Sequence, residues 1–362
     1  MKQHNKRVLI AGASGVIGQA ALSRFEREGW DIIALSRRAP RISSPEHVTH
    51  LPVDLTDPHA CTAAIASFPA VTHLVYCAVQ ESNDLRQGWR NPEQMQTNAR
   101  MLRNLTDPLI RAGSLAHMSL FQGTKAYGAH LHPIPIPARE DLPRDPHPNF
   151  YWLQEDYARD VCAREGIAFT IFRPQVVFGD VVGVAMNLIP VIGAYAALRQ
   201  QEGLPFSFPG GPDYLLEAVD SRLIADALLW ATQAPTAANE IFNITNGDLF
   251  TWRGIWPLLA DCLGVEAGEP EPRALARWFP EKADAWENLA QRRRLRCGDL
   301  GQLVGHSHHY ADFCFGYGAK QAIPPALVST IKLRQAGFQG CIDTQSMFRE
   351  AFASMRQLGY LP

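Results

Sequence analysis

Three glycines near the start of the chain, Gly12, Gly15 and Gly18, have a spacing that suits phosphate binding. They follow an apolar run, residues 8–11, that predicts a buried parallel strand, and they open a segment that predicts a helix. In this setting Gly12 makes the tight turn, Gly15 lets a backbone approach a pyrophosphate, and Gly18 lets helix and strand touch. The helix N-terminus would attract the phosphates. The spacing therefore predicts a dinucleotide site, and the alternative is a glycine-rich turn without a chemical role.

A second predicted strand, residues 30–35, is followed by Ser36, Arg37 and Arg38. Proteins of this type that bind NAD place an acidic residue here, on the ribose 2′-hydroxyl, and this chain has none. One hydroxyl and two guanidinium groups suit charge-assisted hydrogen bonds to a 2′-phosphate instead. The segment therefore favours NADP(H) over NAD(H), and the alternative is a surface loop with two ordinary arginines.

The next two predicted strands, residues 47–53 and 71–78, also end in residues that could line a cofactor. Asp54, followed by Leu55, either contacts the adenine or caps the helix that begins after residue 58, and the sequence leaves both open. The second of these strands ends at Ala78, where small side chains would let the cofactor lie against the backbone.

Catalysis beside a nicotinamide needs a proton donor or a group that stabilises an oxyanion. Reductases with this kind of sheet often use a tyrosine with a lysine four residues later on the same helix face. That spacing is absent, because Tyr151 is followed at this distance by Glu155 and Tyr157 by Val161. A lysine, Lys125, stands instead after the fifth predicted strand.

Two segments around these residues, 123–128 (GTKAYG) and 149–156 (NFYWLQED), resemble the progesterone 5β-reductase/iridoid synthase-like family of short-chain dehydrogenases. Further similar segments are 140–144 (EDLPR), Arg173-Pro174, Phe178-Gly179, 242–248 (FNITNGD) with Trp252, and the tail 332–362. The resemblance covers nearly the whole chain. It implies an enzyme in which the hydride of NADPH adds to the β-carbon of an α,β-unsaturated carbonyl compound.

The resemblance places the catalytic tyrosine of the family on Tyr151 and its lysine on Lys125, which has moved to a neighbouring loop. A phenol with a pKa of about 10 is a protonated donor at neutral pH, and it can bond the carbonyl oxygen as enolate charge develops. A nearby ammonium favours partial charge on the phenol and can contact the cofactor ribose. The complete set of residues expected to bind the cofactor is Gly12, Ser14, Gly15, Val16, Ile17, Gly18, Ser36, Arg37, Arg38, Asp54, Leu55, Ala78, Ser119, Lys125 and Tyr151.

The expected substrate is a small or medium apolar carbonyl compound, with an apolar wall formed by Phe121, Phe150, Trp152 and Phe178. Trp152 stands where many plant members carry a second tyrosine. The loop 128–148, rich in proline and histidine, looks shorter than in plant members, so a steroid or large terpenoid is less expected.

Three other functions are compatible with the sequence. They are an ordinary carbonyl reductase, a nucleotide-sugar epimerase or dehydratase of the extended short-chain dehydrogenase type, and a regulator that senses NADPH without turnover. An epimerase should prefer NAD and keep the Tyr-x-x-x-Lys spacing, whereas this chain has Arg37 and Arg38 and lacks that motif.

The alternation of predicted strands and helices is typical of an α/β protein with a Rossmann-type, doubly wound parallel sheet. We expect an NADP-binding domain at 1–180, with 216–250 returning to it. The remainder, 181–215 and 251–362, predicts a smaller, mostly helical substrate-binding portion, with helices over 186–199, 252–263 and 274–296.

Composition limits the remaining choices. The chain has 362 residues, 46% of them hydrophobic, and a formal net charge of −2, which argues against nucleic-acid or anionic-membrane partners. Its seven cysteines include no C-x-x-C pair and suit reduced thiols in the cytoplasm. Residues 306–309 (HSHH) lack matching acidic or cysteine ligands, so no metal is expected. The sequence is compatible with a homodimer.

Overall fold

The structure, a computed structural model, describes residues 6–68, 70–82 and 85–362, and the chain forms two compact units. The first unit consists of the residues up to Gln175, Ser221–Ile244 and Val328–Gly340, and the second of Val176–Asp220, Thr245–Leu327 and Cys341–Pro362.

These boundaries differ from the expected ones mainly at Val328–Gly340, which the sequence placed in the substrate-binding portion. Here Ser329 N–H donates to the Ala138 carbonyl at 2.8 Å, and the Lys332 ammonium pairs with Glu240 at 2.6 Å. These contacts tie the segment to the first unit.

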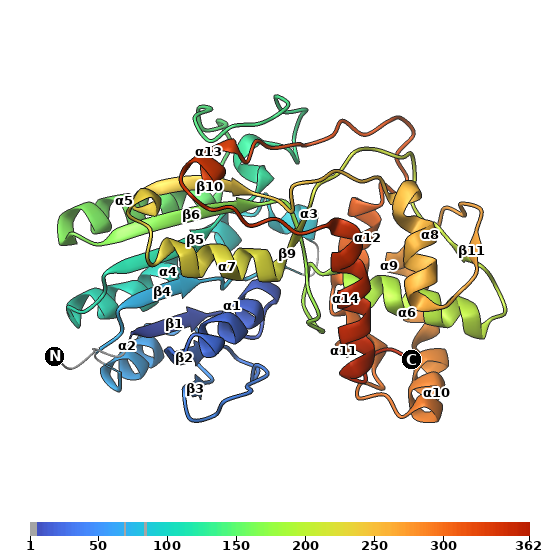
Figure 1. Ribbon diagram of the computed structural model, residues 1–362, viewed down its shortest axis with the longest axis horizontal. Coiled ribbons are helices and arrows are strands. Elements are labelled where there is room, and N and C mark those ends of the chain that lie inside the picture. The colour runs from blue at the N-terminus through green and yellow to red at the C-terminus, as the bar shows by residue number, and fades with distance from the viewer. Residues whose placement is uncertain (1–5, 69, 83–84) are drawn as a thin grey trace. The chain divides into compact units, whose positions relative to one another are not determined.

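The first unit is built on a seven-stranded parallel sheet with the order β10-β6-β5-β4-β1-β2-β3 (Figure 1). The strands are β1 Arg7–Ala11, β2 Asp31–Leu35, β3 Val48–Leu51, β4 His73–Tyr76, β5 His117–Phe121, β6 Ala168–Pro174 and β10 Glu240–Ile244. Residues 8–11 of β1 are wholly buried, as expected for a central strand covered on both faces. The strand order reverses at β1, so the carboxyl ends of β1 and β4 mark the place where such sheets bind ligands. The predicted doubly wound Rossmann-type fold is confirmed.

The helices of the first unit form two groups. Helix α1 (Val16–Arg27) packs against α7 (Ser221–Ala231), while α4 (Pro92–Arg111) packs against both α2 (Pro58–Ala66) and α5 (Phe150–Glu165). The side chains of α2, α4 and α5 share one apolar core with the sheet. Short elements complete the unit: α3 Leu85–Gly88, η1 Thr124–Tyr127, η2 Pro235–Ala237 and α13 Ile331–Gln335.

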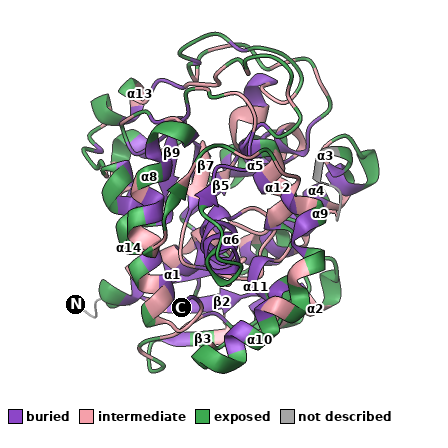
Figure 2. Ribbon diagram, turned by 90° about the vertical axis from the view of Figure 1, so that its right-hand side faces the viewer, coloured by how far each residue is buried: buried purple, intermediate pink, exposed green. Residues whose placement is uncertain are grey.

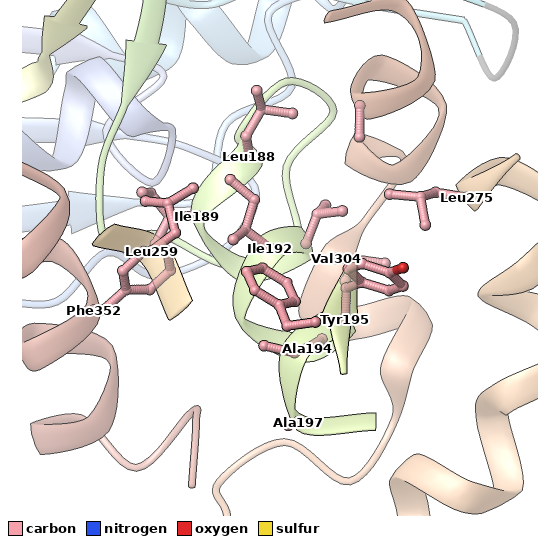
Figure 3. Close-up of a cluster of buried hydrophobic side chains, with 14 of the residues drawn as sticks. Leu188, Ile189, Ile192, Ala194, Tyr195, Ala197, Leu259, Leu275, Val304 and Phe352 are labelled. Carbon is pink, nitrogen blue, oxygen red and sulfur yellow. The ribbon is translucent and has the colours of Figure 1, made fainter. Parts of the chain in front are cut away.

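The second unit is mostly helical, as predicted, and it surrounds helix α6 (Leu188–Gln201). Every residue of α6 from Leu188 to Arg199 is buried, which Figure 2 shows in purple. Figure 3 shows Ile192 and Tyr195 of this helix among side chains from other elements, including Leu259, Leu275 and Phe352. The other elements are β7 Val176–Phe178, β8 Phe206–Ser207, β9 Ala218–Asp220, α8 Trp252–Leu263, β11 Ala267–Gly268, α9 Leu275–Trp278, η3 Pro280–Lys282, α10 Ala283–Arg293, α11 Leu300–Val304, α12 Ser307–Cys314 and α14 Thr344–Gln357.

Two expectations about this part of the chain were wrong in detail. The helix predicted over 274–296 is divided into α9, η3 and α10, because Pro280 lacks the N–H that a continuous helix needs. Of the segment 216–250, which was expected to return to the first domain, only Ser221–Ile244 belongs to the first unit; β9 pairs separately with β7, and β10 joins the main sheet.

Candidate functional site

The glycine turn after β1 is shaped by close backbone contacts. Gly12 has φ +84°, and a Cβ there would lie 2.9 Å from the backbone N of Ala78. A Cβ on Gly18 would lie 2.1 Å from the Gly12 carbonyl oxygen, so only glycine fits at both positions. Gly15 is the N-cap of α1 and supplies no capping side chain, which leaves N–H groups of the first turn available to an anion. Ser14, Val16 and Ile17 are half-buried around this turn, and together the residues fit the pyrophosphate of a dinucleotide.

The segment after β2 presents two exposed arginines, Arg37 and Arg38. Ser36 is buried, and its hydroxyl donates to the Arg38 carbonyl oxygen at 2.6 Å. The Ser36 hydroxyl therefore shapes the turn, while the two guanidinium groups remain the candidates for a phosphate.

Asp54, after β3, is exposed and does not cap a helix. Its carboxylate accepts hydrogen bonds from the backbone N–H and the hydroxyl of Thr56, at 2.9 and 2.8 Å. These bonds lower its pKa, and the charge of Arg37 adds to the effect. The N-cap of α2 is Asp57, whose carboxylate accepts from the N–H of His59 at 2.8 Å. The capping alternative for Asp54 was therefore wrong. Leu55, the next residue, is buried.

Ser119, the predicted cofactor contact on β5, is wholly buried. Its hydroxyl has no hydrogen-bond partner within the described residues. It pairs in register with Val75 of β4 and Thr170 of β6. The structure thus places the Ser119 hydroxyl in the middle of the sheet.

Lys125, in η1, lies close to Tyr151, which begins helix α5. Its Nζ atom lies 5.9 Å from the centre of the Tyr151 ring and 3.9 Å from the centre of the Trp89 ring. Burial lowers the pKa of Lys125 to about 8, although the charge of Glu81 acts in the opposite direction. Glu81 also accepts a hydrogen bond from Gln94 at 3.2 Å. The structure therefore brings together the two residues that the resemblance singled out, although they belong to different elements.

Tyr151 is held at the start of α5 by the cap of that helix. Its backbone N–H donates to the side-chain oxygen of Asn149, the N-cap, at 3.1 Å. The hydroxyl lies over Gly123, where a Cβ would approach it to 3.4 Å. Burial raises the pKa of Tyr151 well above its ordinary value, helped by the charge of Glu81 and opposed by that of Arg173. The phenol therefore keeps its proton at neutral pH.

Glu155 occupies the position, four residues after Tyr151, where the common motif has lysine. It is 3% exposed, and its carboxylate pairs with Arg144 and Arg159, each at 2.9 Å. Gln122, which follows β5, donates to it at 2.8 Å, and Gln122 in turn accepts from Arg173 of β6 at 2.7 Å. This carboxylate anchors α5 to the ends of two strands, so the position is not available to a catalytic lysine.

Three of the four expected pocket residues, Phe121, Phe150 and Trp152, lie in the first unit. Phe150 and Tyr151 belong to a small apolar cluster, and the half-buried Trp152 packs against it. Phe121 is half-buried beside Phe172, with ring centres 6.2 Å apart.

Phe178, the fourth residue, has no exposed surface. Its ring packs against Phe348 of the second unit, with ring centres 5.0 Å apart. Phe178 is therefore a core residue, and its expected place in the substrate wall was wrong.

Sequence reasoning missed Glu81, Trp89 and Arg173 as parts of this arrangement. Arg173 stands in one of the segments that carry the family resemblance, which was the one signal available for it. Glu81 and Trp89 lie in the irregular stretch after β4, where neither spacing nor periodicity points to Lys125.

The described residues contain neither a metal-binding cluster nor a membrane-spanning helix. Among them no three His, Cys, Asp or Glu side chains are grouped so that they could hold a metal ion. Even α4, with 20 residues, lacks the apolar length to cross a membrane, and no other described helix has it.

Comparison with known proteins places the chain in a family. Residues 8–245 match the family described as the NAD dependent epimerase/dehydratase family. The chain is 28% identical over 375 residues to an (S)-8-oxocitronellyl enol synthase of Antirrhinum majus, covering 98% of this chain and 92% of the relative. It is 32% identical over 301 residues to another enol synthase of that name from Nepeta racemosa, covering 78% and 74%. It is 29% identical over 391 residues to a short chain dehydrogenase of Penicillium aethiopicum, covering 99% of both.

Solved structures agree with the fold. A UDP-glucose 4-epimerase of Thermotoga maritima, solved with UDP-glucose, gives a TM-score of 0.69 at 15% identity and covers 97% of this chain and 99% of that one. A UDP-glucose 4-epimerase of Thermus thermophilus, in complex with NAD, gives 0.67 at 18% identity with the same coverage. The chain belongs to the NAD dependent epimerase/dehydratase family, whose members depend on a nicotinamide dinucleotide. Its likeness to the enol synthases confirms the resemblance to the progesterone 5β-reductase/iridoid synthase-like proteins, and with it the expected oxidoreductase class.

Proposed function

We propose that the chain is an NADPH-dependent enone reductase, which reduces the C=C bond of α,β-unsaturated carbonyl compounds. The observation that carries the proposal is the meeting of Lys125 and Tyr151, with 5.9 Å between the ammonium nitrogen and the ring centre. The ion pairs of Glu155 argue against the usual helical Tyr-x-x-x-Lys pair. Relatives named enol synthases over most of the chain support a small carbonyl substrate.

The cofactor proposed is NADP(H). The turn at Gly12, Gly15 and Gly18 would hold its pyrophosphate, and Arg37 and Arg38 would hold the 2′-phosphate. When bound, NADPH would supply a hydride to the β-carbon of the substrate.

Tyr151 is proposed to stabilise the enolate oxygen. Because burial keeps the phenol protonated, its O–H can donate to the carbonyl oxygen of the substrate and stabilise the charge that develops there. One such donor contributes roughly 3 kcal/mol at the transition state. The enolate then takes a proton from solvent water at its α-carbon, which gives the saturated carbonyl compound and leaves hydroxide in solution.

Lys125 supports this step through its charge. With a pKa of about 8, its ammonium is mostly protonated at neutral pH, and it favours negative charge on the phenol and the bound oxygen. The face of Trp89 and the carboxylate of Glu81 hold the ammonium beside Tyr151. Phe121, Phe150 and Trp152 are proposed as the apolar wall for a small or medium substrate.

The proposal is tested by the consumption of NADPH with a small cyclic enone, with identification of the product. We expect the saturated ketone from the wild type and a large loss of turnover in Tyr151→Phe and Lys125→Ala. Reduction of the carbonyl group alone would favour an ordinary carbonyl reductase. Binding of NADPH without turnover of any enone in a panel would contradict the proposal and favour the sensing regulator.

A further inference from the structure

The loop between η1 and α5 contains a carboxylate, Asp145, that is bonded on both sides by histidines. His132 donates through Nε2 and His147 through Nδ1 to the two oxygens of Asp145, each at 2.6 Å. The Asp145 side chain is 14% exposed. Burial acts to raise its pKa, but the hydrogen bonds from the two histidines outweigh burial and lower it. Asp145 is therefore a charged carboxylate with a histidine hydrogen bond on each oxygen, and it lies within a loop rich in proline and histidine.

On one side, this group reaches the turn that carries Lys125. The Gly128 N–H donates to the Lys125 carbonyl at 3.1 Å, and the His132 N–H donates to the Gly128 carbonyl at 3.1 Å. Gly128 has φ +77°, and a Cβ there would lie 2.6 Å from both the Asp145 oxygen and His132 Nε2. The end of this turn is thus packed directly against the Asp145–His132 pair.

On the other side, the same carboxylate reaches the helix that carries Tyr151. Because Nδ1 of His147 donates to Asp145, the other ring nitrogen of His147, Nε2, accepts from the side-chain amide of Asn149 at 3.2 Å. The Asn149 side-chain oxygen accepts from the Tyr151 N–H at 3.1 Å. The directions of these bonds are mutually consistent, because each group donates with one atom and accepts with another.

A continuous chain of hydrogen bonds therefore runs from the backbone of Lys125 to the backbone of Tyr151. We infer that Asp145 is a positioning residue, which fixes the turn carrying Lys125 and the start of the helix carrying Tyr151 relative to each other. It acts through His132 and Gly128 on one side and through His147 and Asn149 on the other. The catalytic consequence rests on the proposed function of Tyr151 and Lys125, whereas the mechanical link does not.

Hydrogen exchange tests the link without any substrate. In Asp145→Ala we expect the amides of Gly128, His132 and Tyr151 to exchange about tenfold faster or more than in the wild type, while amides of the central strands stay unchanged. Asp141→Ala, at an exposed acid on the same loop, is the matched control and should leave all three amides as they are. Faster exchange on only one side of Asp145, or on neither, would overturn the inference.

Kinetics tests the consequence for catalysis. We expect Asp145→Ala to lower kcat for a cyclic enone by roughly tenfold, because the catalytic pair is misplaced. Added to Tyr151→Phe, the same change should cost much less than in the wild type, since the two residues then act as one unit. Full additivity would overturn the positioning role. A wild type that reduces no enone would contradict the proposed function, while the exchange result would still decide the link.

Discussion

The Lys125 ammonium lies against the face of Trp89, with 3.9 Å between the nitrogen and the ring centre. The charge of Glu81 also favours the protonated lysine. The residues after β4 thus form an environment for a lysine that follows β5. Because a cation inside the protein needs such partners, this environment decides how much of Lys125 is charged at a given pH.

We predict that Glu81→Gln moves the alkaline limb of the pH–rate profile to lower pH. Lys125 is charged below its pKa of about 8, and Glu81 raises that pKa against the effect of burial. Removal of the carboxylate charge lowers the pKa further, so activity should be lost at lower pH, by on the order of one unit. The measurement is kcat/KM for a cyclic enone against pH, with Asp141→Asn as the control. An unchanged midpoint in Glu81→Gln would show that Lys125 does not set this limb.

A second prediction concerns the choice of cofactor. Arg37 and Arg38 are exposed after β2, and no acidic residue stands beside them in the segment 36–38. Replacing both with alanine should weaken NADPH binding by about tenfold to a hundredfold, because charge-assisted hydrogen bonds to the 2′-phosphate are lost. Binding of NADH should change by less than about twofold. Calorimetric titration of both cofactors measures this difference, and Arg27→Ala, at an exposed arginine of α1, is the control. Equal losses for the two cofactors would contradict a 2′-phosphate site.

Strands such as β1 and β2 could be predicted because they are short, mostly apolar runs that end at glycine or at a polar residue. The turn at Gly12 and Gly18 was predictable for a similar reason, since the absence of a Cβ at each position has a steric cause. The steric cause at Gly18 is local, because a Cβ there would meet the Gly12 carbonyl of the same turn.

The surroundings of the candidate site could not be predicted in the same way. Glu155 meets Arg144 and Arg173, and Lys125 meets Trp89, only because separate elements converge at one end of the sheet. Asp54 and Asp57 are equally good caps by type, and only the backbone of the turn decides between them. Phe178 stands in one of the segments that resemble the family, but its ring packs in the core of the second unit.

The third prediction concerns Glu155→Lys, which restores the Tyr-x-x-x-Lys spacing on α5. An ammonium there would face Arg144 and Arg159, where a carboxylate now pairs with both at 2.9 Å. We therefore expect activity to be lost and the free energy of unfolding to fall by about 3 to 5 kcal/mol, because the introduced ammonium would be buried without an anionic partner. Urea unfolding measures the loss, with Glu165→Lys at the exposed end of the helix as the control. Retained stability with higher turnover would show that the usual motif can work in this fold.

The last prediction concerns the half-buried His73 of β4 and the buried His117 of β5, whose ring centres are 6.0 Å apart. Burial lowers the pKa of His73 to about 4, with help from Lys6, and that of His117 to about 3, with help from His73. In the unfolded chain both should titrate near 6.5. Between these values the unfolded state binds more protons, so the free energy of unfolding decreases as the pH falls below about 6.5.

Each of the two histidines should contribute about 1.4 kcal/mol of this loss per pH unit, until the folded state is protonated as well. Urea unfolding of the wild type at a series of pH values measures the slope. His117→Leu removes one of the groups, and Thr170, which shares a hydrogen bond with His117, keeps its bond to the Ala237 carbonyl. The variant should therefore show a slope lower by about 1.4 kcal/mol per unit, since carboxylates contribute equally to both proteins. Equal slopes in the two proteins would mean that His117 is already charged in the folded state.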